Sequence, residues 1–369
     1  MKKLLLSAAV MAGTLTACVY PFDPELDISA EKIPVVDGNI RLGDYSSLRL
    51  DYLMDLDGPI RANASGEAWI EDNLGNRYNP LSNSSSMQFD TREAPADRQY
   101  RAVVVMNGET YHSAWLTPEP APEITGISFT ADEDDVHVDV SLKSGTSGSG
   151  YIGLSYEETW EFHSDFTVQY VIDPNSWTYS MLMGSYPFYW CFRDHNSQST
   201  TLVDYSQLEG GEINHFPLLS FPRTDSRNHK RYSILVKAYS LSEEAGEYLR
   251  QTEEISQAGG SLFSPDPGAL TGNLVCASNP EKEVLGLVKI GVISHKRAFL
   301  QGIYLKSVRP SEAMLILPRE EDLYSLYYFE NYRPVKDIAL GDEKGIGWGP
   351  HRCINCIEAG GYQITPYFW

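Results

Sequence analysis

A β-hairpin signal stands in Arg101-Ala102-Val103-Val104-Val105-Met106-Asn107-Gly108-Glu109-Thr110-Tyr111-His112-Ser113-Ala114-Trp115. Asn107-Gly108 lies between two runs rich in Val, Thr and Tyr, the residue types that favour strands. A type I′ turn needs positive φ at both central residues, which Asn and Gly tolerate. The stretch therefore predicts two antiparallel strands joined by a two-residue turn.

The same short alternating runs continue on the N-terminal side of this hairpin. They cover residues 33–40, 47–52, 66–70, 100–106 and 109–115. Several short strands at such spacing are typical of a β-sandwich, which we expect over residues 33–118. The segment Pro118-Glu119-Pro120-Ala121-Pro122 interrupts strand pairing and predicts a spacer between two domains.

A second β-rich domain carrying one amphipathic helix is expected over residues 123–369. Strand patterns occur at residues 124–130, 136–142, 151–169, 231–239, 284–293 and 297–304. The helix is expected at about 242–258, with Ser242 as its N-cap and a stripe of Ala245, Tyr248, Leu249, Thr252 and Ile255. The whole chain therefore reads as mainly β.

The first eighteen residues have the pattern of a bacterial lipoprotein signal. Lys2-Lys3 precede an apolar run over residues 4–15, and Leu15-Thr16-Ala17 precede Cys18. We expect residues 1–17 to be a signal peptide and Cys18 to carry the lipid, palmitate included. An ordinary signal peptide cut elsewhere is the alternative. Residues 18–32, rich in Pro and acidic residues, then form a lipidated tether.

Composition limits the partners that the protein can have. The 369 residues include 50 Asp and Glu against 29 Lys and Arg, a formal net charge of −21. Such a charge argues against nucleic acid and against adsorption on anionic lipid. No later run reaches the length of about 18 apolar residues that a spanning helix requires, so membrane contact is expected through the lipid anchor only.

Four cysteines remain besides Cys18. They are Cys191, Cys276, Cys353 and Cys356. An even number in an oxidising compartment predicts structural disulfides, and three pairings are possible. For the Cys-x-x-Cys pair, zinc binding and free thiols are the alternatives.

Candidate chemistry is sparse. Glu157, Glu158 and Glu161 lie near Trp160 and would suit a glycosidase if two of them faced a shared cleft. In a strand, Glu158 and Trp160 share one face while Glu157 and Glu161 share the other, which favours structural hydrogen bonding. We expect no catalytic, metal or cofactor site, and hence no enzyme.

An aromatic segment at residues 177–190 offers candidates for partner binding. They are Trp177, Tyr179, Met181, Met183 and Tyr186. Met and aromatic residues are enriched in adaptable interface cores. Core packing is the alternative, and the sequence leaves open whether the segment is exposed.

Several spans resemble one family in their order and spacing. They are residues 35–38, 156–161, 189–192, 231–236, 241–245, 262–267, 271–274, 284–286, the pair Cys353 and Cys356, and residues 360–361 and 366–369. Together they resemble the lipoproteins of domain of unknown function family number 4249, found mainly in Bacteroidota. The resemblance implies an immunoglobulin-like N-terminal domain and a surface lipoprotein often encoded beside a TonB-dependent outer-membrane transporter. It implies no catalytic residues.

These patterns lead to one main functional hypothesis and two alternatives. The main one is a lipid-anchored protein of the outer membrane, facing the cell exterior, that serves as a non-catalytic capture or lid subunit of a TonB-dependent transporter in nutrient uptake. The first alternative is a subunit of an outer-membrane assembly or export machine. The second is an enzyme acting on glycan or peptide. Small-molecule, glycan or peptide ligands all stay open, as do partner stoichiometry, the leaflet that carries the anchor and the disulfide pairing.

Overall fold

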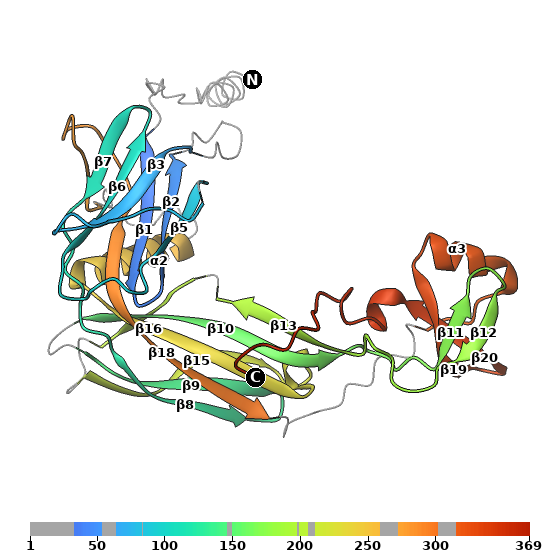
Figure 1. Ribbon diagram of the computed structural model, residues 1–369. Coiled ribbons are helices and arrows are strands. Elements are labelled where there is room, and N and C mark those ends of the chain that lie inside the picture. The colour runs from blue at the N-terminus through green and yellow to red at the C-terminus, as the bar shows by residue number, and fades with distance from the viewer. Residues whose placement is uncertain are drawn as a thin grey trace, which may run out of the picture.

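The computed structural model describes residues 33–53, 64–82, 84–145, 150–197, 199–205, 211–258, 272–301 and 315–369. The expected signal peptide, the lipidation of Cys18 and the tether over residues 18–32 lie outside the described residues. Strands dominate the described chain, so the prediction of a mainly β protein is confirmed. Figure 1 shows three parts in succession: an upright first sandwich, a second sandwich below it and a small module at the far end. Among the described residues no helix is both long and apolar enough to cross a membrane.

The first sandwich contains two sheets around one core. Its strands are β1 (Pro34–Leu42), β2 (Tyr45–Tyr52), β3 (Glu67–Asp72), β4 (Arg77–Tyr78), β5 (Ser86–Asp90), β6 (Tyr100–Met106), β7 (Glu109–Ser113) and β17 (Leu274–Cys276). One sheet runs β1-β2-β5 and the other β17-β7-β6-β3-β4. The predicted hairpin is confirmed, because Asn107 and Gly108 have φ of 51° and 79° between β6 and β7.

The strand order of this sandwich fits the immunoglobulin-like topology that the resemblance implies. Sheets ordered β1-β2-β5 and β7-β6-β3-β4 correspond to an A-B-E and a G-F-C-C′ arrangement. Tyr100, fully buried at the start of β6, donates a hydrogen bond of 2.6 Å from its hydroxyl to the carbonyl of Pro95. A tyrosine in this place closes the corner that precedes the sixth strand of such sandwiches.

The second sandwich packs a three-stranded sheet against part of a large one. The small sheet holds β8 (Glu123–Ala131), β9 (Asp135–Lys143) and β15 (Glu212–Pro222). The large sheet contributes β10 (Tyr151–His163), β13 (Trp190–Asn196), β14 (Thr201–Asp204), β16 (Arg231–Leu241) and β18 (Val288–Gln301). Alternate residues of β9 and β16, such as Val138 and Val236, are fully buried between the sheets, as the period-two pattern requires.

One long strand connects the two sandwiches. The sequence predicts two strands at residues 284–293 and 297–304, but the structure has the single strand β18 there. Its first half pairs in parallel with β1, with Ile40 opposite Ile290, and its second half pairs antiparallel with β16. The sheet is therefore continuous across the domain boundary that the sequence predicts at residues 118–123, and that boundary stays a prediction.

The helix α2 (Glu243–Ala258) covers the junction of the two sandwiches, close to its predicted place. The N-cap is confirmed, since the Ala245 amide donates to Ser242 Oγ at 3.2 Å. Tyr248 and Leu249 pack on the sheet, whereas Thr252 is exposed, contrary to the expected stripe. The side chain of Ile255 lies outside the described residues. A Cβ at Gly246 would lie 2.0 Å from the Tyr151 ring, so only glycine allows the helix to approach this closely.

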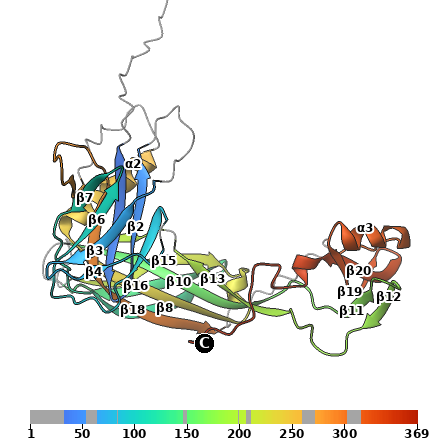
Figure 2. The ribbon, with the colours of Figure 1, turned by 45° about the horizontal axis from the view of Figure 1, so that its top comes forward.

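The distal module at the far end is built from two hairpins and a short helix. Its elements are β11 (Tyr170–Asp173), β12 (Thr178–Met181), α3 (Leu323–Tyr328), β19 (Tyr332–Leu340) and β20 (Glu343–Pro350). Figures 1 and 2 both place it away from the first sandwich, with the second sandwich between them. A separate module and its helix were not predicted within residues 123–369.

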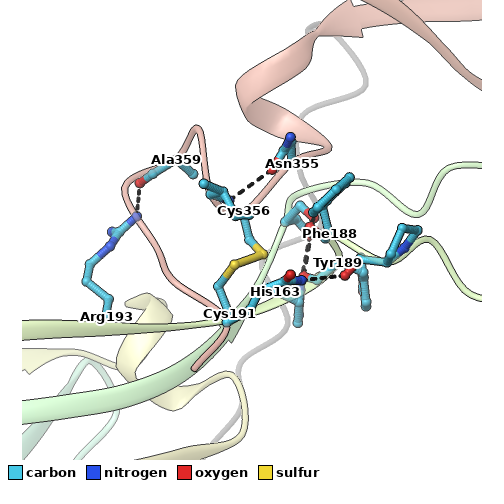
Figure 3. Close-up of a disulfide and its surroundings, with 12 residues drawn as sticks. His163, Phe188, Tyr189, Cys191, Arg193, Asn355, Cys356 and Ala359 are labelled. Carbon is cyan, nitrogen blue, oxygen red and sulfur yellow. Dashed lines mark hydrogen bonds between the residues drawn. A yellow bond between two sulfur atoms is a disulfide. The ribbon is translucent and has the colours of Figure 1, made fainter. Parts of the chain in front are cut away.

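A disulfide joins the second sandwich to the chain that returns from the distal module. Cys191 in β13 is bonded to Cys356, 165 residues later (Figure 3). Nearby, Arg193 donates to the carbonyl of Ala359, and the Cys356 amide donates to the carbonyl of Phe188. The disulfide and these two hydrogen bonds fix the junction between the second sandwich and the distal module, which we call the neck.

The expectation that the four cysteines pair as structural disulfides is wrong for two of them. Cys276 and Cys353 are buried free thiols. Cys276 lies in the core of the first sandwich, while Cys353 lies in the core of the distal module, so the two cannot meet. Burial raises the pKa of the Cys353 thiol to about 11, which keeps it protonated.

A pair of stacked histidines at the neck makes stability depend on pH. The His163 and His229 rings lie 4.0 Å apart, and burial together with His163 lowers the pKa of His229 from 6.5 to about 4. The unfolded chain therefore binds a proton below about pH 6.5 that the folded chain does not. We expect the free energy of unfolding to fall by about 1–2 kcal/mol between pH 6.5 and 4, after allowance for partial exposure. Urea titrations across this range measure it. In a His229→Gln variant, the free energy of unfolding should fall less between pH 6.5 and 4 than in the wild-type protein. An unchanged pH dependence would contradict the assignment to His229.

Candidate functional site

The distal module presents a cluster of aromatic rings on its surface, which we call the distal aromatic face. Its members are Trp177, Tyr324, Tyr327, Tyr328 and Phe329. The Trp177 ring lies 6.3 Å from Tyr324, 6.0 Å from Tyr327 and 6.4 Å from Tyr328, measured between ring centroids. The Tyr324 and Tyr328 rings lie 4.8 Å apart. Aromatic pairs at such distances attract each other beyond simple burial, so the rings support one another on the surface.

The register of α3 explains why these rings face outward. Leu323 and Leu326, three residues apart, are buried against the fully buried Trp348. Tyr324 and Tyr328, four residues apart, therefore lie together on the other side of the helix. Tyr324, Tyr328 and Phe329 are 58%, 52% and 77% exposed. Large apolar side chains gathered in this way mark a contact surface more often than isolated ones do.

The backbone at Trp177 is held in an unusual conformation. Trp177 has φ of 53°, a left-handed value that is rare for a bulky residue. It ends the turn between β11 and β12, where its amide donates to the carbonyl of Asp173 at 2.8 Å. Such a conformation persists only where surrounding contacts enforce it, and it is common at functional sites. Here it points the indole at α3.

The predicted partner-binding residues are divided between surface and core. Tyr179, Met181 and Met183 are exposed, whereas Trp177 and Tyr186 are half-buried. Tyr186 packs on the core that holds Phe166 and Val335, so that residue follows the core-packing alternative. The sequence interpretation missed the four aromatic residues between positions 324 and 329. A Leu-x-x-Leu pattern interleaved with aromatic residues is the signal that would have shown them.

The rim of the distal aromatic face is acidic. Glu320, Glu321 and Asp322 directly precede α3 and are exposed, and Glu321 Oε1 lies 3.6 Å from Nη1 of the exposed Arg319. Arg333 is already used inside the module, where its guanidinium carbon lies 3.8 Å from the Tyr327 ring centroid and it donates to the carbonyl of Tyr327. Exposed aromatic rings beside carboxylates suit a partner surface that offers apolar and basic side chains.

The carboxylates that suggested glycosidase chemistry are engaged in structural contacts. Glu158 is 1% exposed and accepts hydrogen bonds from His195 Nδ1 at 2.7 Å, Arg227 Nε at 2.8 Å and the Tyr232 hydroxyl at 2.9 Å. The predicted division of faces is confirmed, since Glu158 and Trp160 are buried on the same side of β10. A carboxylate this fully bonded to cationic and hydroxyl donors is a structural anchor.

The two carboxylates on the other face of β10 are also paired. Lys237 Nζ lies 2.7 Å from Glu157 Oε1 and 2.7 Å from Asp44 Oδ2, which connects the second sandwich to the first. Glu161 pairs with Lys230. Among the described residues no group of three or more His, Cys, Asp or Glu side chains is placed to hold a metal ion.

One family model matches the chain. It is described as a domain of unknown function (DUF4249), and the match covers residues 19–297. The matched span includes β11 and β12 but ends before α3, β19 and β20. No curated protein matches the sequence.

Proposed function

The chain belongs to the DUF4249 family of domains of unknown function, and from this premise we propose that it is a non-catalytic accessory subunit of a TonB-dependent transporter. In this proposal, the lipid on Cys18 anchors the protein to the outer membrane with its body facing the cell exterior. The protein acts as a capture or lid subunit during nutrient uptake.

The observation that carries the proposal is the distal aromatic face. It lies at the end of the body remote from the first sandwich, which holds the first described strand (Figure 2). A protein anchored through the chain that precedes β1 would carry this face away from its anchor. An exposed aromatic cluster with an acidic rim is suited to contact another protein.

Lipid anchoring makes a modest contact surface sufficient. An anchored protein and a barrel in the same membrane meet in two dimensions, so the effective concentration of one at the other is high. Weak aromatic contacts then give high occupancy. No catalytic group is needed, and the carboxylates that suggested catalysis are committed to Arg227, Lys230 and Lys237.

Substitution of exposed members of the distal aromatic face should weaken partner binding. We expect Tyr328→Ala combined with Phe329→Ala to lower recovery of the transporter at least about tenfold, because aromatic anchors contribute about 2 kcal/mol or more each at such surfaces. Both side chains are exposed, so the core of the module should persist. The measurement is affinity purification of the tagged protein from mild-detergent outer membranes with quantitative mass spectrometry.

Tyr367→Ala supplies the matched control, since Tyr367 is 97% exposed but lies in the C-terminal segment. It should leave recovery unchanged. Equal recovery by the double variant would remove the distal aromatic face as the contact site. Recovery of the outer-membrane assembly machinery in place of a transporter would favour the alternative hypothesis of an assembly or export subunit.

A further inference from the structure

The C-terminal segment crosses the large sheet of the second sandwich and forms a groove there. Tyr362 exchanges two backbone hydrogen bonds with Phe192 of β13, which fixes the segment to the sheet. The groove, which we call the tail groove, lies between this segment and the strands β10, β13 and β16. Its lining consists of Glu161, Phe192, Lys230, Arg231, Thr365 and Trp369.

Strand register places the central lining residues side by side. Glu161 in β10 is directly opposite Phe192 in β13 and directly opposite Arg231 in β16. Residues opposite each other in a sheet project from the same face. The sheet therefore sets an aromatic ring, a carboxylate and a guanidinium in one row.

Two aromatic rings hold the guanidinium of Arg231. Its central carbon lies 4.5 Å from the Phe299 ring centroid and 4.8 Å from the Trp369 ring centroid. Trp369 also contacts Phe192 at 5.2 Å in an edge-to-face arrangement. Stacking engages the faces of a guanidinium and leaves its N–H donors directed outward in its plane. Arg231 is thus oriented by the two rings, and its Nε makes no hydrogen bond to any residue that the structure describes.

Arg231 has no carboxylate partner among the described residues. Other arginines of the chain do: Arg98 pairs with Asp72, Arg101 with Glu71 and Arg227 with Glu158. The carboxylate nearest in register, Glu161, pairs with Lys230. The Nε atom of Arg231 is buried and makes no hydrogen bond. Within the described part of the chain, the guanidinium in the tail groove therefore carries a positive charge that no carboxylate side chain pairs with, although the formal net charge of the protein is −21.

We propose that the tail groove binds a small organic carboxylate that has an aromatic or aliphatic body. Arg231 would donate two parallel hydrogen bonds to the carboxylate, the geometry that guanidinium groups favour. Phe192 and Trp369 would contact the body of the ligand. A single uncompensated charge beside Glu161 suits a monoanion better than a doubly charged phosphate, and the aromatic walls favour an organic body.

The test is to titrate the full chain with N-acetyl-L-phenylalanine and to measure the heat of binding by isothermal titration calorimetry. We expect saturable binding that weakens at least about tenfold for the neutral N-acetyl-L-phenylalaninamide, and little binding of inorganic phosphate. Arg231→Gln should weaken binding of the acid at least about tenfold. Arg231→Lys should weaken it less, because it retains the charge and loses only the planar fork.

Arg297→Gln is the matched control. Arg297 also stacks on an aromatic ring, that of Phe368, but donates to Ser233 and does not line the groove. It should leave binding unchanged. Absence of saturable binding to the wild-type protein, equal binding of acid and amide, or unchanged binding by a folded Arg231→Gln variant would each overturn the proposal. If that variant fails to fold, the comparison of acid with amide on the wild-type protein decides. The outcome is independent of the transporter proposal, which concerns the distal aromatic face.

Discussion

Replacing Arg227 with methionine is expected to lower the free energy of unfolding by about 3–5 kcal/mol. Arg227 lies in the turn before β16 and donates through Nε to Glu158 at 2.8 Å and through Nη1 to Asp225 at 3.0 Å. Its guanidinium also lies over the rings of Trp160 and Phe221. Without it, the buried carboxylate of Glu158 keeps only its hydrogen bonds with His195 Nδ1 and the Tyr232 hydroxyl. Urea unfolding of the purified variant measures the loss.

Two companion variants separate charge from packing in this network. Glu158→Gln combined with Arg227→Met should recover much of the lost stability, because no buried charge then remains while the amide still bonds the Tyr232 hydroxyl. Arg227→Lys should lower the free energy of unfolding by less than Arg227→Met does. A methionine variant within about 1 kcal/mol of wild type would show that Glu158 does not depend on Arg227.

Loss of the Cys191–Cys356 disulfide is expected to have an effect of similar size. The bond closes a loop of 165 residues, and native disulfides typically contribute about 2–5 kcal/mol, mostly through the unfolded chain. Both sulfur atoms lie in the core of the second sandwich, at the neck of the distal module (Figure 3). We expect Cys191→Ser with Cys356→Ser to lower the unfolding free energy by that amount.

Cys353→Ser is the matched control, because Cys353 is a buried free thiol three residues before Cys356. It should cost about 1 kcal/mol or less, as it breaks no covalent link. Reductant should lower the thermal midpoint of the wild-type protein and leave that of the double serine variant unchanged. A double variant as stable as wild type would contradict a structural role for the bond.

Local sequence signals predicted the local structure well. Asn107-Gly108 specified the turn of the β6–β7 hairpin because only a few residue types tolerate positive φ at both places. Ser242 specified the start of α2 because its hydroxyl satisfies an amide that no carbonyl of the helix can reach. Apolar residues recurring along β9 and β16 predicted buried strands, because successive side chains of a strand point to opposite faces of the sheet.

Long-range pairing was beyond such reasoning. Nothing near residue 290 indicates that β18 lies parallel to β1, about 250 residues earlier, since the contact depends on two complementary strand edges. The prediction therefore divided β18 in two and did not place β17 in the first sandwich. The sequence left the disulfide pairing open for the same reason, because Cys191 and Cys356 meet only once the distal module has folded back to the second sandwich.

The candidate site was predicted in part. The segment 177–190 was identified from its aromatic and Met content. The structure exposes Tyr179, Met181 and Met183, and leaves Trp177 and Tyr186 half-buried. Only Trp177 of the distal aromatic face belongs to that segment; its other members lie in α3 or directly after it, more than 140 residues later. Helix propensity alone did not predict α3. A helix of only six residues is not stable by itself, and α3 depends on its packing against Trp348.

Site-specific photo-crosslinking in intact cells from position 329, within the distal aromatic face, is the most direct test of the proposed contact with a transporter. Phe329 is 77% exposed, and a crosslinker at Leu81, which is 60% exposed in the first sandwich, supplies the comparison. We expect an adduct with a TonB-dependent barrel from position 329 and none from position 81. A barrel adduct from position 81 alone, or no barrel adduct from either position, would contradict it.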